Sequence, residues 1–470
     1  MNRLVETGKN FMGYTSLHGL SRIADAKFWL KKLVWCLLFL GSLGMCVFQV
    51  TRLFEQFYKY QVNTKIEFQY DTLTFPGVAI CNVNPIQYQH TVKIPRLFRI
   101  IRALSINTGI ALEEFSLGEV YVNESLYVNN TYVNNDNSWD HAIQSFRTEM
   151  AGMPDDLLEG ASQTSDQFIN ECRMNRKACN SSIIKPFRDP YYGLCFKLES
   201  EHLVFGPGEI YGLEVLLNVD QYNYLPFIAQ SEGISLQIYN NKYSPTVATT
   251  GISLPVGFEV DIGITKKISH RLPGPYEICD VKNIFDSMQA CLLPCINFKI
   301  IELCDCARDY IEEEEENDIH YCISDADVKC LLDTLANLET DLACPDCKPP
   351  CSQTTYEKSV SMKKWPSKNF EPYVKKFENH SLKSNDLIKL RVYYTSLLTE
   401  SKTEEMAYTS ENFVSDIGGQ LGLWIGMSVV ELVFLLIYAC VRKTKTEDDQ
   451  IFTANQKKEQ NDTITVIEIE

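Results

Sequence analysis

SDIGGQLGLWIGMSVVELVFLLIYACVR, residues 415–442, is long and apolar enough to cross a bilayer. Gly418, Gly422 and Gly426 recur at every fourth position, so in a continuous helix they share one face and let a neighbouring helix approach closely. Asp416 lies at the outer end of the segment, and Glu431 lies inside the apolar run, where a carboxylate costs about 2.5–3.5 kcal/mol on insertion scales. The pattern favours a helix that lines a water-filled pore. The alternative is a plain single-span anchor with a glycine dimerisation face and a tolerated acid.

Composition narrows the class of protein. The chain has 470 residues, enough for a large core outside any membrane segment. Its formal net charge of −17 makes nucleic acid a poor partner and cations plausible ones. The sequence contains no G-x-S-x-G elbow, no H-E-x-x-H and no phosphate-binding glycine loop, so we expect no enzyme.

The cysteines are unevenly distributed. Cys36, Cys46 and Cys440 lie in apolar, membrane-like segments, and the other fourteen of the 17 cysteines fall between positions 81 and 351. An even number in one block is typical of a disulfide framework in an oxidising compartment. The spacing of 304/306 and of 344/347 would also suit zinc, but disulfides are the favoured interpretation. We therefore expect neither a metal nor a cofactor.

A second apolar segment precedes the cysteine block. Residues 33–50, LVWCLLFLGSLGMCVFQV, carry no charge and follow a basic flank that places the N-terminus in the cytosol. A cleaved signal peptide is the weaker alternative, because the run starts late and no small-residue cleavage site follows it. Arg442 and Lys443 place the C-terminus in the cytosol too. The expected organisation is a cytosolic N-terminus (1–32), a first transmembrane helix (33–53), an extracellular domain (54–411), a second, pore-lining transmembrane helix (412–441) and a cytosolic tail (442–470).

The segment between the spans has extracellular features. Strand-like runs at 74–81, 211–219, 233–239 and 387–395 and helical patterns at 94–105 and 328–342 predict a mixed α/β domain. It also carries N-glycosylation sequons, which are typical of exposed loops in secreted domains. The acceptor asparagines are Asn123, Asn129, Asn180 and Asn379.

Five features together resemble the degenerin/epithelial sodium channel (DEG/ENaC) family, with the acid-sensing and nematode degenerin branches most similar. They are the ordered cysteines, His18-Gly19 before the first span, and the strings DIGGQLGLWIGMS (416–428), LTFPGVAICNVNP (73–85) and YGLCFKL (192–198). The resemblance covers about 18–442. It implies an α+β membrane protein with two transmembrane helices, whose disulfide-rich ectodomain is likened to a hand with a central β-sheet, a finger and a thumb (about 279–351). It also implies a trimer of identical or homologous subunits, surrounded by lipid in the plasma membrane.

The disulfide pairing is likewise implied by the resemblance, since sequence alone leaves many pairings open. The family's order gives two pairs early in the ectodomain and five in the thumb, where they would form a ladder that stiffens a lever. The implied pairs are Cys81–Cys195, Cys172–Cys179, Cys279–Cys351, Cys291–Cys347, Cys295–Cys344, Cys304–Cys330 and Cys306–Cys322.

The resemblance also implies how ions would pass. Gly426, Met427 and Ser428 match the family's G-x-S selectivity filter, where oxygens replace the hydration shell of the permeating ion, here expected to be Na⁺. Asp416 would concentrate cations at the outer mouth. The resemblance further implies sensitivity to amiloride. The other pore positions are Glu431, Gly418, Gly419 and Gly422.

Gating residues follow from the same resemblance. Ser415 stands at a position where the family keeps a small residue and where a larger one holds channels open; the alternative interpretation is a helix N-cap. His18 and Gly19 match the cytosolic gating motif. Tyr276 stands where acid-sensing members place a wrist tryptophan and is expected to face aromatics such as Tyr58 or Tyr60.

One departure leaves a second function open. Glu431 follows Ser428 by three residues, whereas the family's glutamate follows the filter serine by about six. The alternative is therefore a non-conducting auxiliary subunit, or a receptor-like ectodomain protein that assembles with other channel subunits. The stimulus and any extracellular ligand are also open: Asp333 and the run at 312–316 offer carboxylates for proton gating, but no histidine follows the first span where that branch has one.

Overall fold

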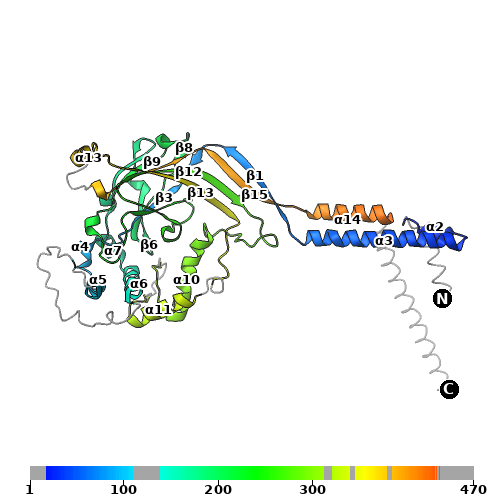
Figure 1. Ribbon diagram of the computed structural model, residues 1–470, viewed down its shortest axis with the longest axis horizontal. Coiled ribbons are helices and arrows are strands. Elements are labelled where there is room, and N and C mark those ends of the chain that lie inside the picture. The colour runs from blue at the N-terminus through cyan, green and yellow to red at the C-terminus, as the bar shows by residue number, and fades with distance from the viewer. Residues whose placement is uncertain are drawn as a thin grey trace, which may run out of the picture. The chain divides into compact units, whose positions relative to one another are not determined.

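The computed structural model describes residues 17–108, 112, 138–311, 320–338, 344–377, 384–428, 430 and 433. The chain forms two units, one of Met1–Asn63 with Glu405–Glu470 and the other of Thr64–Glu404. Figure 1 labels helices and strands of both units. The unit of Met1–Asn63 with Glu405–Glu470 is called the membrane unit, because it contains the apolar helix near the N-terminus.

The membrane unit contains three helices in its described part. α3 (Trp29–Phe57) has 29 residues, and among the described helices it alone is both long and apolar enough to cross a membrane. Its exposed leucines, valines and phenylalanines suit contact with lipid rather than water. α14 (Ser410–Ile425) runs alongside it, and the short α2 (Leu20–Asp25) packs near its N-terminal end.

The other unit is built on β-sheets. Its smaller sheet contains two strands that are buried along their whole length, β3 (Gly77–Asn82) and β10 (Ile234–Tyr239), in agreement with the strands expected at 74–81 and 233–239. Within the described residues the strands form a larger sheet, a smaller sheet and a two-stranded pair of β2 (Leu73–Thr74) with β8 (Leu203–Val204). The smaller sheet has the order β11 (Ile252–Leu254), β10 (Ile234–Tyr239), β3 (Gly77–Asn82), β7 (Gly193–Leu198) and β6 (Ile184–Asp189).

The larger sheet is organised around one long strand, β12. This strand pairs antiparallel with β13 along its whole length, and parallel with β14 in its first half and with β15 near its end. Apolar side chains of both sheets meet in one core, in which Val78 and Ile238 lie with Val215, Val260 and Leu390. The strand order is β1 (Val62–Tyr70), β15 (Leu398–Met406), β12 (Phe258–His270), β14 (Leu387–Tyr394), β9 (Leu213–Asn218), β4 (Ile169–Met174) and β5 (Lys177–Ala178), with β13 (Ser352–Lys364) on β12.

Helices form a second core beside the sheets. Leu97, Ile101 and Phe146 are fully buried where α5 and α6 pack together, as the helical pattern at 94–105 predicts. α11 lies against α6 (Figure 1). The helices are α4 (Tyr88–Thr91), α5 (Pro95–Thr108), α6 (Ser138–Ala151), α7 (Asp155–Ala161), α8 (Ser165–Phe168), α9 (Val247–Thr250), α10 (Met288–Cys304), α11 (Asp325–Asn337) and α13 (Glu371–Phe377), with 3₁₀ turns at Ser181–Ile183, Glu209–Tyr211, Gln221–Asn223 and Ser384–Asp386.

Seven disulfides have the pairs that the resemblance implies. Two lie in the sheets: Cys81–Cys195 joins the neighbouring strands β3 and β7, and Cys172–Cys179 closes the hairpin of β4 and β5. The other five staple the segment between β12 and β13, which contains α10 and α11. They are Cys279–Cys351 at the root of this segment, Cys291–Cys347 and Cys295–Cys344 along α10, and Cys304–Cys330 and Cys306–Cys322 at its far end.

Candidate functional site

The pore-helix candidate, α14, begins before the glycines that recur in it. The hydroxyl of Thr409 accepts a hydrogen bond from the N–H of Asn412 at 3.2 Å and caps α14, which starts at Ser410. Ser415 therefore lies inside the helix, where its side chain is exposed. The alternative interpretation of Ser415 as the N-cap is wrong, because the chain turns helical five residues earlier.

One face of α14 packs on α3. The ring of Phe413 stacks on Phe57 at 4.5 Å between centroids and meets the edge of Phe54 at 4.9 Å. Further along, the indole N–H of Trp424 donates a hydrogen bond to the side-chain oxygen of Gln49 on α3 at 2.8 Å. Aromatic packing at one end and a polar contact at the other thus fix the pair of helices.

The glycines lie on a face of α14 that this chain leaves uncovered. A Cβ placed on Gly418, Gly419 or Gly422 would meet no atom within 4 Å. Ser415 and Asp416, which precede them, are exposed as well. This face is free to receive further helices at close range, as small residues permit.

Asp416 is held by a neighbouring tyrosine. The hydroxyl of Tyr408 donates a hydrogen bond of 2.6 Å to its carboxylate. Partial desolvation and this bond raise the pKa of Tyr408 to about 12, so the phenol stays protonated and keeps donating at physiological pH. The carboxylate thereby has a fixed direction near the start of α14.

Gly426 ends α14. Its φ of +72° is a left-handed conformation that glycine adopts without steric cost, and the N–H of Met427 bonds back to the carbonyl of Leu421 at 3.3 Å. Gly426 therefore leaves the helical face expected for it, and α14 does not run unbroken through 412–441. Ser428 lies exposed just beyond this end. The carbonyl end of a helix carries partial negative charge, which favours cations near Gly426 and Ser428.

The His-Gly motif touches this helix end. The N–H of His18 donates to the carbonyl of Ile425 at 2.8 Å, and a Cβ added to Gly426 would lie 2.6 Å from the imidazole of His18. Gly19 has a φ of +87° and precedes α2. The structure thus brings together His18 and the predicted filter, two motifs that are about 400 positions apart in the sequence.

Aromatic residues gather where α3 ends and α14 begins. Tyr58 and Tyr60 contact each other edge to face at 6.2 Å, and Phe57 lies within 6.5 Å of Tyr408. Sequence reasoning missed Phe54, Phe57 and Tyr408, although aromatic residues flanking a span are typical of membrane interfaces. Tyr276 follows β12 in the other unit, so its expected contact with Tyr58 or Tyr60 stays a prediction.

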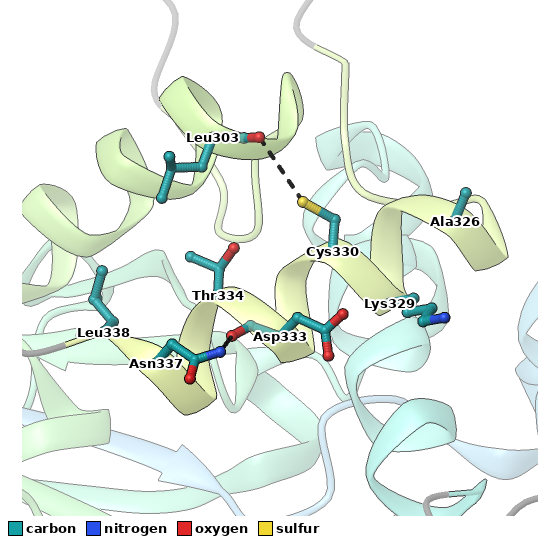
Figure 2. A pocket seen from close by; sticks show the side chains of 8 residues that line it. All are labelled: Leu303, Ala326, Lys329, Cys330, Asp333, Thr334, Asn337 and Leu338. Atoms are coloured by element: carbon teal, nitrogen blue, oxygen red, sulfur yellow. Dashed lines mark hydrogen bonds between the residues drawn. The ribbon is translucent and has the colours of Figure 1, made fainter.

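A hollow of about 590 Å³ lies between the end of α10 and α11 (Figure 2). Asp333, one of the carboxylates considered for proton gating, is exposed on its rim. The sulfur of Cys330 lies 3.9 Å from the carbonyl oxygen of Leu303, but it is disulfide-bonded and has no hydrogen to donate. Leu303, Ala326 and Leu338 make much of the lining apolar, and nothing in it marks a bound ion.

Several predicted positions lie outside the described residues. They are Glu431, the carboxylates at 312–316 and the glycosylation candidates Asn123, Asn129 and Asn379. Asn180 is described and exposed, and its side-chain oxygen accepts from the N–H of Ser182 at 3.3 Å. Among the described residues, no three His, Cys, Asp or Glu side chains are grouped as metal ligands would be.

Comparisons with a family model and with individual proteins point to the same family. The family model described as "Amiloride-sensitive sodium channel" matches residues 11–438. The epithelial sodium channel subunit gamma of Neoceratodus forsteri is 25% identical over 90% of this chain and 81% of that relative. The degenerin-like protein asic-2 of Caenorhabditis elegans is 24% identical over 97% and 92%, and the human epithelial sodium channel subunit alpha is 24% identical over 90% and 76%. Members of the matched family are ion channels of the plasma membrane and not enzymes. The chain belongs to the amiloride-sensitive sodium channel family.

Proposed function

We propose that this protein is a subunit of a trimeric, amiloride-sensitive, sodium-selective channel of the plasma membrane, gated through its ectodomain. The observation that carries the proposal is the uncovered glycine face of α14, whose opposite face is packed on α3. Three such faces around an axis would line a narrow pore. Asp416 at one end and the carbonyl end of α14 at the other both favour cations over anions.

The residues take the following roles in the proposal. Gly426, Met427 and Ser428 form the selectivity filter just beyond the end of α14, where backbone oxygens and the Ser428 hydroxyl would replace the hydration shell of the ion. Ser415 is the gate position, His18 and Gly19 support the inner end of α14, and Tyr276 is a hinge. Glu431, Gly418, Gly419 and Gly422 line the ion path. Both termini are cytosolic, and the partners are identical or homologous subunits.

Voltage clamp of cells that express the chain tests the proposal. We expect a current that amiloride blocks and that reverses near the sodium equilibrium potential. The stimuli to compare are acid, peptide and membrane stretch, together with no stimulus at all. Absence of sodium current under all of them, with the protein at the cell surface, would contradict the conducting role.

A second candidate is an auxiliary subunit that does not conduct by itself. The spacing of three residues from Ser428 to Glu431 favours it, because it shortens the segment between filter and glutamate relative to the family. Under this alternative, the chain alone is silent but alters the selectivity or amplitude of the current of a coexpressed family member.

A further inference from the structure

The hydrogen bond between Trp424 and Gln49 crosses between the two spans in an apolar setting. The indole N–H of Trp424 is shared between the side-chain oxygen of Gln49 at 2.8 Å and that of Gln420 at 3.1 Å. Gln420 lies one turn earlier on the same helix, so its bond restricts the rotation of the indole. Only the bond to Gln49 ties the indole to α3.

The helices approach closely at this level. Cys46, one turn before Gln49 on α3, is 3% exposed, and its sulfur lies 4.0 Å from the backbone carbonyl oxygen of Gln420. In the sequence, Gln49 stands between Phe48 and Val50, and Trp424 between Leu423 and Ile425, so both polar side chains belong to apolar segments. A polar group without a partner is costly in an apolar environment, so the hydrogen bond between the amide and the indole is favoured.

Trp424 is two residues from the point where α14 ends. Beyond it, Gly426 is left-handed, and the bond from His18 to Ile425 holds the end on one side. The hydrogen bond that Trp424 donates to Gln49 holds the residue before Ile425 to α3. Without it, the last turn of α14 loses a side-chain hydrogen bond to α3.

We infer that Gln49 is a positioning residue for ion selectivity, which acts through Trp424 to fix the direction of the segment Gly426–Ser428. This inference rests on the proposed function, because it needs that segment to be the filter. In this role Gln49 acts through Trp424 and not by contact with the ion. Its substitution should therefore change the sodium-to-potassium permeability ratio more than the amount of protein at the cell surface.

The test is a double-mutant cycle of Gln49→Leu and Trp424→Phe, with Gln49→Met as a second variant that keeps length and loses the acceptor. Thr51→Val is the matched control, since the Thr51 hydroxyl bonds only within α3, to the carbonyl of Val47 at 2.8 Å. The readouts are the sodium-to-potassium permeability ratio from reversal potentials, surface protein, and thermal unfolding of the full chain in detergent.

We expect each single variant to lower the permeability ratio about fivefold, the factor that corresponds to one hydrogen bond of about 1 kcal/mol. The double variant should show the same loss and not its square, because both changes remove the same hydrogen bond between α14 and α3. Thr51→Val should leave the ratio unchanged. Unfolding temperatures should show the same lack of additivity.

Different failures are distinguishable. If the changes in unfolding temperature are not additive but the permeability ratios stay the same, the bond only stabilises the pair of helices. This result would overturn the positioning role. If the two single changes in unfolding temperature add up in the double variant, Gln49 and Trp424 do not interact, and the inference fails at its first step. A wild-type channel without sodium current would overturn the proposed function and the selectivity role together, while the unfolding cycle would still decide whether the contact exists.

Discussion

The N–H of His18 donates a hydrogen bond of 2.8 Å to the carbonyl of Ile425, and the imidazole of His18 fills the space beside Gly426. This pair joins the segment before the first span to the end of α14. A side chain on Gly426 would have to displace the ring. The contact gives the His-Gly motif a physical role at the place where the helix ends.

Gly426→Ala should therefore reduce the current strongly. The added Cβ would lie 2.6 Å from the imidazole of His18, and alanine in a left-handed conformation costs about 1–2 kcal/mol. His18→Ala in the same chain removes the clash but not the backbone cost, so the double variant should recover part of the current. Whole-cell current per surface subunit is the measurement. Gly41→Ala on α3, where a Cβ meets nothing within 4 Å, is the control. A double variant with no recovery would argue against the contact.

Ser428→Phe should abolish or reshape sodium-to-potassium discrimination while surface expression persists. Ser428 lies exposed beyond the end of α14, where a bulky ring would narrow the proposed filter. Reversal potentials in mixed sodium and potassium solutions give the answer. Ser42→Ala is the control, because its hydroxyl bonds only to the Phe39 carbonyl of its own helix. An unchanged reversal potential in a conducting Ser428→Phe channel would remove Ser428 from the filter.

Ser415→Val should produce a sustained, amiloride-sensitive current without stimulus. A larger side chain would crowd the closed arrangement of pore helices, and about 3 kcal/mol of strain there shifts the open-to-closed ratio by over a hundredfold. Thr409→Ala is the matched comparison: it removes the true cap of α14, costs about 1 kcal/mol and should lower expression without opening the channel. A silent Ser415→Val channel at normal surface density, beside a working wild type, would contradict the gate assignment.

Asp286→Asn should stabilise the protein at neutral pH and not in acid. Burial raises the pKa of Asp286 to about 6, and its Oδ1 is buried with no hydrogen-bond partner among the described residues. Since the folded state prefers the protonated acid, stability falls as the pH rises from about 4, near the pKa of an unfolded aspartate, to about 6. We expect a gain on the order of 1 kcal/mol above this range, after allowance for solvent screening. Thermal unfolding of the full chain between pH 4 and 7 measures it, with exposed Asp333→Asn as control. If Asp286→Asn stabilises the protein equally in acid, the gain does not come from the ionisation of Asp286, and the prediction is wrong.

Mass spectrometry under non-reducing conditions should find no free thiol between Cys81 and Cys351. All fourteen cysteines of this block are paired in the structure. Cys36 and Cys46 are free in the described part of the chain and should react with alkylating reagent after denaturation. Stoichiometric zinc, or several alkylated cysteines inside the block, would overturn the framework.

Local pattern and family resemblance together predicted much of this molecule. The first span, the buried strands β3 and β10 and the helix α5 follow from runs and periods of apolar residues. The disulfide pairs could not follow from spacing, because many pairings satisfy the same count. They followed from the resemblance alone.

The contacts between α3 and α14 were not predictable. A spacing of four placed Gly426 on the same helical face as Gly422, but helix periodicity carries no information on where glycine will adopt a positive φ. Gln49 and Trp424 are ordinary residues in apolar runs until two helices set them opposite each other. The sequence did not identify Thr409 as the N-cap of α14, because a cap depends on backbone direction and not only on residue type.

The neighbouring position of β1 and β15 in the larger sheet has a consequence for biosynthesis. β1 is made soon after α3 and β15 just before α14, with more than 300 residues of chain between them. β12 likewise has all its paired strands later in the sequence, and two of these pairings are parallel. Such long-range pairing is slow to form. The larger sheet cannot be completed until β15, which lies just before α14, has been synthesised, so the exposed edges of the early strands must be protected during most of the synthesis of the chain.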